Sequence, residues 1–196
     1  MSAFISIHCR QKWAGLGLAL GAALLAASGG AISQGNPAQG AVTAAANRTL
    51  EAADQKFVTD AARGGLAEVG MGQMAQERGR NPQVKAFGER MVRDHGKANE
   101  DLKQVATAKG VALPTAMGPE HQQHADRLGK LSGIDFDRAY MKHMVDDHKK
   151  DMADFEKAAK SAKDADVKDF AARTLPTLKE HGQMAQTTFG EVREGR

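Results

Sequence analysis

The sequence has little cysteine, no β-strand pattern and no excess of charge of one sign. Its single cysteine among 196 residues is Cys9, which precedes an apolar run near the N-terminus. A mature chain without this region contains no thiol, so it can form neither a disulfide nor a thiolate metal site. Because Cys9 lies before the apolar run and not after it, it also cannot be the lipidated cysteine of a lipoprotein.

Residues 1–31 have the order of a secretory signal peptide. Arg10 and Lys12 form a positive region, the stretch 13–27 is apolar, and small residues follow it. The apolar run is shorter than the roughly 20 residues that a transmembrane helix needs. We therefore expect an exported protein, cleaved near residues 27–31, that is periplasmic or associated with the outer membrane. An uncleaved membrane anchor is the alternative.

The charges of the mature chain are nearly balanced and are interspersed along it. The whole sequence has 27 Lys and Arg and 24 Asp and Glu, and the basic residues Arg10 and Lys12 belong to the expected signal peptide. The mature chain therefore keeps 25 basic residues against 24 acidic ones, a net charge of +1. No basic patch is present, so we expect no nucleic-acid partner. We also expect no transmembrane segment in the mature chain.

The remainder of the chain is rich in helix-forming residues, and no alternation of apolar and polar residues predicts a strand. We expect a flexible segment over 32–50 and one helical domain over 51–192. A long connection over 111–134 contains a predicted short helix at 120–131. The spacing of apolar residues predicts four long helices, at 54–78, 81–110, 135–160 and 164–190.

The lengths of the connections favour one topology. The first two long helices are joined tightly around 79–81 and the last two around 161–163, so each pair is expected to form an antiparallel hairpin. The connection over 111–134 is long enough to run back along the domain. We therefore predict an all-α, ferritin-like four-helix bundle with one long crossover between the second and third long helices, which then run parallel.

A short motif occurs once in each of these two helices. The sequence MVRDH ends at His95, and MVDDH ends at His148. Parallel helices in the same register place equivalent residues at equivalent heights, so the two histidines are expected to face each other. Glu68 and His181 interrupt the apolar spacing near the middle of the other two long helices. The four side chains are therefore predicted to meet in one layer of the core.

A polar layer inside an apolar bundle is costly unless its members bind one another or a ligand. Three imidazoles and one carboxylate suit one divalent transition metal such as zinc, copper, iron or manganese. The alternative is a hydrogen-bonded layer without metal in a structural or interaction module. Asp94 and Asp147 lie about 100° around their helices from the histidines. We expect them to support the ligands or to lie at the surface, although a small rotation would make them ligands.

Methionine offers a third interpretation. Met91 precedes His95 by one helical turn, and Met144 precedes His148 in the same way, so each helix places a thioether and an imidazole on one face. Thioether and imidazole together suit Cu(I). The pattern therefore favours a protein that handles copper in the periplasm. Methionine is also a common filler of helical cores, so packing is the competing explanation.

The sequence predicts no catalytic residue, and an enzyme is the less favoured class. Serine and threonine are scarce along the apolar faces, and no glycine-rich loop follows a strand. Di-iron proteins of ferritin-like fold use Glu-x-x-His motifs, but Val92, Val145 and Leu178 stand three residues before the three candidate histidines. The remaining histidines of the domain are expected to be solvated: His121, His124 and His143.

Four segments carry a resemblance to a family of exported bacterial proteins. They read FVTDAARGGLAEVGMGQMA, VKAFGERMVRDHGKANEDL, FDRAYMKHMVDDHKKDMADFEKAA and VKDFAARTLPTLKEHGQMA. In this order they resemble a domain of unknown function whose members are often labelled as outer-membrane proteins. The resemblance covers about 54–190 of the chain. It implies a ferritin-like four-helix bundle and no particular activity.

Overall fold

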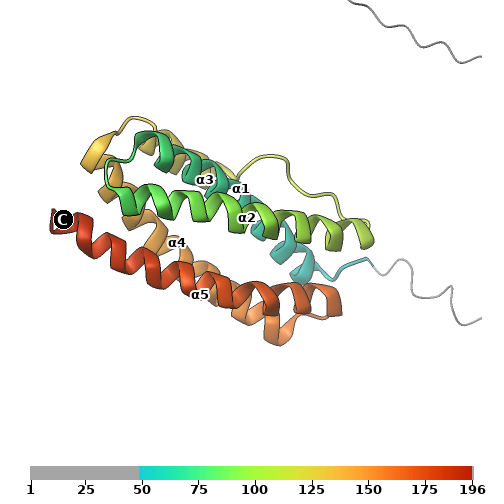
Figure 1. Ribbon diagram of the computed structural model, residues 1–196. Helices are drawn as coiled ribbons and strands as arrows, with labels where there is room; N and C mark the ends of the chain where they lie inside the picture. Colours follow the sequence, from blue (N-terminus) through green and yellow to red (C-terminus); the bar gives the residue numbers. More distant parts are fainter. Residues whose placement is uncertain (1–48, 196) are drawn as a thin grey trace, which may run out of the picture. The chain divides into compact units, whose positions relative to one another are not determined.

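The computed structural model describes residues 49–195, which contain five α-helices and no strand (Figure 1). The predicted signal peptide at 1–31 and nearly all of the predicted flexible segment at 32–50 lie outside these residues. The all-helical prediction is confirmed for the part that is described. The helices are α1 (Ala52–Arg78), α2 (Pro82–Ala108), α3 (Pro119–Leu128), α4 (Gly133–Ser161) and α5 (Ala165–Arg193).

Local sequence explains where several of these helices begin and end. Asn81 accepts a hydrogen bond from the backbone N–H of Gln83, and Pro82 is the first residue of α2; both features are typical of helix starts. Asp164 likewise accepts hydrogen bonds from two backbone N–H groups at the start of α5. Gly110 follows the end of α2 with a φ of 65°, in the left-handed region that glycine tolerates best.

Each of the four long helices packs against two of the others. α1 lies along α2 and α4 lies along α5, and further contacts join α2 to α5 and α1 to α4. The short helix α3 lies against α1 and α4. None of the helices in residues 49–195 has both the length and the apolar character to cross a membrane.

Two buried aspartates align the two hairpins. Asp137, near the start of α4, accepts hydrogen bonds from the backbone N–H groups of Arg80 (3.0 Å) and Asn81 (2.8 Å) in the turn between α1 and α2. Asp54, near the start of α1, accepts hydrogen bonds of 2.9 and 2.7 Å from residues 163–164 in the turn between α4 and α5. Each helix therefore starts beside the end of the other. α1 and α4 run antiparallel, so α2 and α4 run in the same direction (Figure 1).

Two glycines let α1 and α2 approach closely. A Cβ atom on Gly72 would lie 2.8 Å from the backbone oxygen of Gly88, and a Cβ atom on Gly88 would lie 2.6 Å from the backbone oxygen of Gly72. Neither position has room for a side chain without moving the backbone. The close approach brings the inward faces of the two helices, which carry Glu68 and His95, toward each other.

Two hydrophobic clusters meet at a polar layer. One cluster contains Met71, Phe87, Met91, Tyr140 and Met144, and the other contains Val58, Leu102, Phe155, Phe170 and Leu178. Along each long helix, one polar residue lies at the boundary between the two clusters. These four polar side chains are almost completely buried, with exposed fractions of 1% for Glu68, 5% for His95 and 0% for His148 and His181.

Candidate metal centre

The structure brings the three predicted histidines together in the core. His95 comes from α2, His148 from α4 and His181 from α5. The centroid of the His95 ring lies 5.8 Å from that of His148 and 5.2 Å from that of His181, and the His148 and His181 centroids are 5.5 Å apart. One nitrogen from each ring lies within 4.8 Å of the corresponding nitrogens of the other two.

One nitrogen of each imidazole is held by a hydrogen-bond partner. Nδ1 of His95 lies 2.8 Å from Oε2 of Glu68, and Nε2 of His181 lies 2.9 Å from Oδ2 of Asp94. Nδ1 of His148 lies 3.0 Å from the backbone oxygen one turn earlier in α4. His148 and His181 donate from these nitrogens, because a carbonyl oxygen and an ionised carboxylate can only accept.

The second nitrogen of each ring is buried and has no hydrogen-bond partner among residues 49–195. These atoms are Nε2 of His95, Nε2 of His148 and Nδ1 of His181. A buried polar atom without a partner costs free energy, so three of them in one place call for an explanation. Metal-bound histidines have this pattern, since one nitrogen binds the ion while the other donates to a carboxylate or a carbonyl oxygen.

Burial keeps the histidines neutral. It lowers the pKa of His95, His148 and His181 to about 4, because the charged imidazolium loses its hydration in the core. A neutral imidazole has a lone pair available to a metal, whereas an imidazolium has none. The three rings are therefore in the ligand form at neutral pH.

Asp94 and Glu68 differ in their charge. Burial acts to raise the pKa of Asp94, but hydrogen bonds from His181, Arg90 and Arg93 lower it to about 2. Burial raises the pKa of Glu68 well above its ordinary value, and repulsion from Asp147 adds to this effect. The contact that holds His181 is therefore anionic, while Glu68 favours its protonated form when no cation is near.

Glu68 belongs to two groups at once. Its Oε2 lies against His95, while its Oε1 is 3.5 Å from Nε2 of His148. Potential ligand atoms of Glu68, Asp147 and Asp151 also lie within 4.8 Å of one another. Asp151 was not predicted to be a site residue, although it follows Asp147 by one helical turn, a spacing that places both carboxylates on one face of α4.

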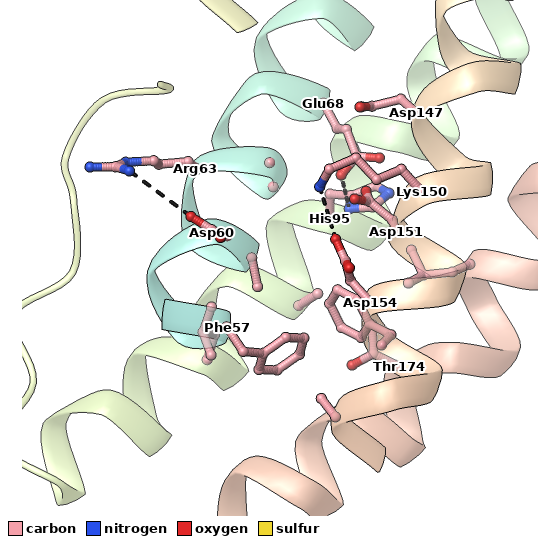
Figure 2. Close-up of a pocket in the computed structure, with 18 of the residues that line it drawn as sticks. Phe57, Asp60, Arg63, Glu68, His95, Asp147, Lys150, Asp151, Asp154 and Thr174 are labelled. Carbon is pink, nitrogen blue, oxygen red and sulfur yellow. Dashed lines mark hydrogen bonds and ion pairs between the residues drawn. The ribbon is translucent and has the colours of Figure 1, made fainter. Parts of the chain in front are cut away.

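A cleft of about 650 Å³ connects this region with the surface (Figure 2). Its lining includes buried Glu68 and His95 together with the exposed residue Lys150. Figure 2 shows Asp147 and Asp151 near Glu68, on the side of the cleft formed by α4. The acidic residues give a cation a polar route from solvent toward the histidines.

His121, His124 and His143, which were predicted to be solvated, are less exposed than expected. All three are only partly exposed, and all line the cleft. The rings of His124 and His143 are stacked, with centroids 4.2 Å apart. Burial, together with the neighbouring His124 and His121, lowers the pKa of His143 to about 4. The physical reason is that α3, which carries His121 and His124, packs against α1 and α4 and covers His143 of α4.

The methionines of the two MVxDH motifs lie in the apolar core. Met91 and Met144 are completely buried in the same hydrophobic cluster. The sulfur of Met184, which lies near His181 in sequence, accepts a hydrogen bond of 3.2 Å from Arg90. These surroundings fit a packing role for the thioethers.

Comparison with known proteins gives a family and a fold. Residues 39–188 match the sequence family described as Domain of unknown function (DUF4142). No curated protein matches the chain. The fold is similar to that of a DUF305 fragment from Deinococcus radiodurans, with a TM-score of 0.64 and 12% identity over 74% of this chain and 99% of the other. It is also similar to CopM in the Cu(II)-bound form, with a TM-score of 0.60 and 14% identity over 70% of this chain and 96% of CopM.

Proposed function

Since the chain belongs to the DUF4142 family, whose function is unknown, we propose a role for it from the geometry of its core. The protein binds one divalent transition metal at His95, His148 and His181. These three residues are here called the inner centre. The observation that carries the proposal is the meeting of three buried imidazoles, each with one buried nitrogen that has no hydrogen-bond partner in the described part of the chain. A bound metal ion satisfies all three at once.

The neighbouring side chains have defined roles in this proposal. Asp94 holds His181, and Glu68 holds His95, so that the remaining nitrogen of each ring is directed to the ion. A bound cation favours the ionised form of Glu68, whose Oε1 is then the fourth ligand or the acceptor for a metal-bound water. Asp147 lies near Glu68, and its negative charge adds to the attraction of this region for a cation.

The donor set narrows the choice of metal. Imidazole nitrogens with one carboxylate suit zinc, copper, iron and manganese. Copper is included on a further ground, because CopM, which has a similar fold, is described in a Cu(II)-bound form. The alternative of Cu(I) handling through Met91 and Met144 has weaker support, since both side chains are packed in a hydrophobic cluster.

We also propose the ferritin-like four-helix arrangement with a long crossover, and export of the protein to the cell envelope. The shared direction of α2 and α4, and the long connection that contains α3, support the arrangement. The order of charge, apolar run and small residues over 1–31 supports export. Together with the inner centre, export implies that the protein binds metal in the cell envelope.

A structural polar layer without metal is the second candidate function. The Glu68–His95 and Asp94–His181 contacts support it, because both can form in the absence of an ion. The raised pKa of Glu68 agrees with a protonated carboxyl group that shares a hydrogen bond with His95.

Metal binding by matched variants separates the two candidates. Untagged, metal-free protein would be dialysed against zinc, copper, iron or manganese, and the bound metal measured by elemental analysis. We expect His148→Gln to lose one bound ion relative to the wild type. His124→Gln removes an imidazole from outside the centre and should lose none. Equal metal content in the wild type and His148→Gln would overturn metal binding at the inner centre and leave the structural role.

A further inference from the structure

A second group of ligand side chains lies outside the inner centre. His121 of α3 and His143 and Asp147 of α4 each offer one potential ligand atom, and these three atoms lie within 4.8 Å of one another. α3 packs directly against α4, so the group joins the connection helix to a helix of the core. All three residues are partly exposed, in contrast to the buried histidines.

Each member of this group has a buried atom that nothing in residues 49–195 satisfies. These atoms are Nδ1 of His121, Nε2 of His143 and Oδ2 of Asp147. A partly exposed side chain can usually turn its polar atoms to water, so three buried and unpaired atoms on adjacent side chains are unexpected. Because the pKa of His143 is lowered to about 4 by burial, its ring is neutral and can act as a ligand.

We propose that His121, His143 and Asp147 form a second site for a divalent transition metal, here called the outer site. Two imidazoles and one carboxylate are a donor set for borderline metals such as zinc and iron, and they leave coordination positions for water or another ligand. The outer site goes beyond the proposed function of the inner centre and does not rest on it, because the two sites share no ligand among their three-residue groups.

The outer site lies where the cleft passes from the surface toward the core. His121, His143 and Asp147 all line the cleft, as do Glu68 and Asp151. Asp147 also belongs to the carboxylate group that contains Glu68 and Asp151. A metal in the outer site is therefore next to the carboxylates that lead to the inner centre.

His124 provides a matched control for His121. Both are histidines of α3, both are partly exposed and both line the cleft. Nδ1 of His124, however, is paired with Arg127 at 2.9 Å, and its ring stacks on that of His143. His124 is absent from the group of potential ligands. Replacing it removes an imidazole of the same helix without removing a proposed ligand.

Zinc stoichiometry tests the outer site in the full chain. Metal-free wild type, His121→Gln, His124→Gln and Asp147→Asn would be dialysed against zinc chloride, and bound zinc counted by elemental analysis. We expect one zinc ion fewer per chain in His121→Gln than in the wild type. We expect no loss in His124→Gln, and zinc binding at the outer site of Asp147→Asn weakened at least about tenfold.

The same experiment distinguishes the two sites. His148→Gln should keep the zinc that His121→Gln loses, and His121→Gln should keep the zinc that His148→Gln loses. If only His148→Gln failed to lose zinc, the inner centre would be refuted and the outer site would stand. The outer site is refuted if His121→Gln binds as much zinc as the wild type, or if His124→Gln loses zinc equally, which would indicate unspecific binding by surface histidines.

Discussion

The inner centre and the outer site use the same kinds of side chain in different surroundings. His95, His148 and His181 come from three long helices and have exposed fractions of 5% or less. His121, His143 and Asp147 are partly exposed, and two of them come from one helix. A change at the inner centre therefore affects the packing of the whole domain, whereas a change at the outer site affects mainly the contact between α3 and α4.

The largest expected effect is the loss of stability of the metal-free protein in acid. The pKa of each inner histidine is about 4 in the folded protein, below the ordinary value of about 6.5 in the unfolded chain. Between these values the unfolded state binds more protons, so the free energy of unfolding falls as the pH falls from 6.5 toward 4. The slope is up to about 1.4 kcal/mol per pH unit for each histidine.

Urea denaturation at pH 7, 6 and 5 measures this slope. His148→Gln removes one of the three groups and should have a shallower slope than the wild type. His121→Gln keeps all three inner histidines, so its slope should be steeper than that of His148→Gln. A free energy of unfolding that stays constant from pH 7 to pH 5 would contradict the buried, neutral state of the inner histidines.

The next largest effect is expected from truncating one histidine at each site in the metal-free protein. His148→Ala should lower the free energy of unfolding by about 2–4 kcal/mol, because it leaves a cavity and removes the partners of buried polar atoms. His121→Ala should change it by at most about 0.5 kcal/mol, since its side chain is partly exposed. Urea denaturation at pH 7 compares them. An equal loss of free energy of unfolding in the two variants would mean that His121 contributes as much to the stability of the core as His148.

Chelation should have an effect of similar or smaller size on the metal-loaded protein. A ligand that binds only the folded state stabilises it by about 2.7 kcal/mol at a free concentration 100 times its dissociation constant. Removing the metal should therefore lower the melting temperature of the wild type. The shift should be reduced in both His148→Ala and His121→Ala, because each variant keeps the metal of one site only. A wild type that melts identically with and without each metal would contradict a metal-coupled core.

A smaller effect is expected from the residue that holds His181. Asp94→Asn replaces the anionic acceptor of the His181 Nε2–H group and should weaken metal binding at the inner centre by about 10–100-fold. Binding at the outer site should not change. Calorimetric titration with zinc would show both affinities, and an unchanged inner affinity would remove Asp94 from its orienting role.

The inner centre could be predicted from the sequence because it lies on long helices. The helical period of 3.6 residues identifies the inward face, and each face has one polar interruption near its middle. The repeated MVxDH motif relates His95 to His148 in register. The spacing of polar residues along the helices does not determine which nitrogen of each ring lacks a partner. That depends on the contact of His95 with Glu68, of His181 with Asp94, and of His148 with the backbone oxygen one turn earlier.

The outer site and the alignment of the hairpins could not be predicted in the same way. His121 lies in the connection, where no long helical face defines an inward direction, and its burial depends on how α3 packs. The hydrogen bonds of Asp54 and Asp137 join residues 109 and 57 positions apart, respectively. Such contacts follow from tertiary packing and leave no periodic signal in the sequence.

The position of a bound metal shows directly whether the three buried imidazoles form a metal site. Crystals of the protein grown with zinc would be measured at the zinc absorption edge, so that anomalous scattering locates each ion. We expect a peak at bonding distance, about 2.0–2.1 Å, from Nε2 of His95, Nε2 of His148 and Nδ1 of His181. Ordered histidine rings with no peak among them, at zinc concentrations that saturate the protein in solution, would contradict this expectation.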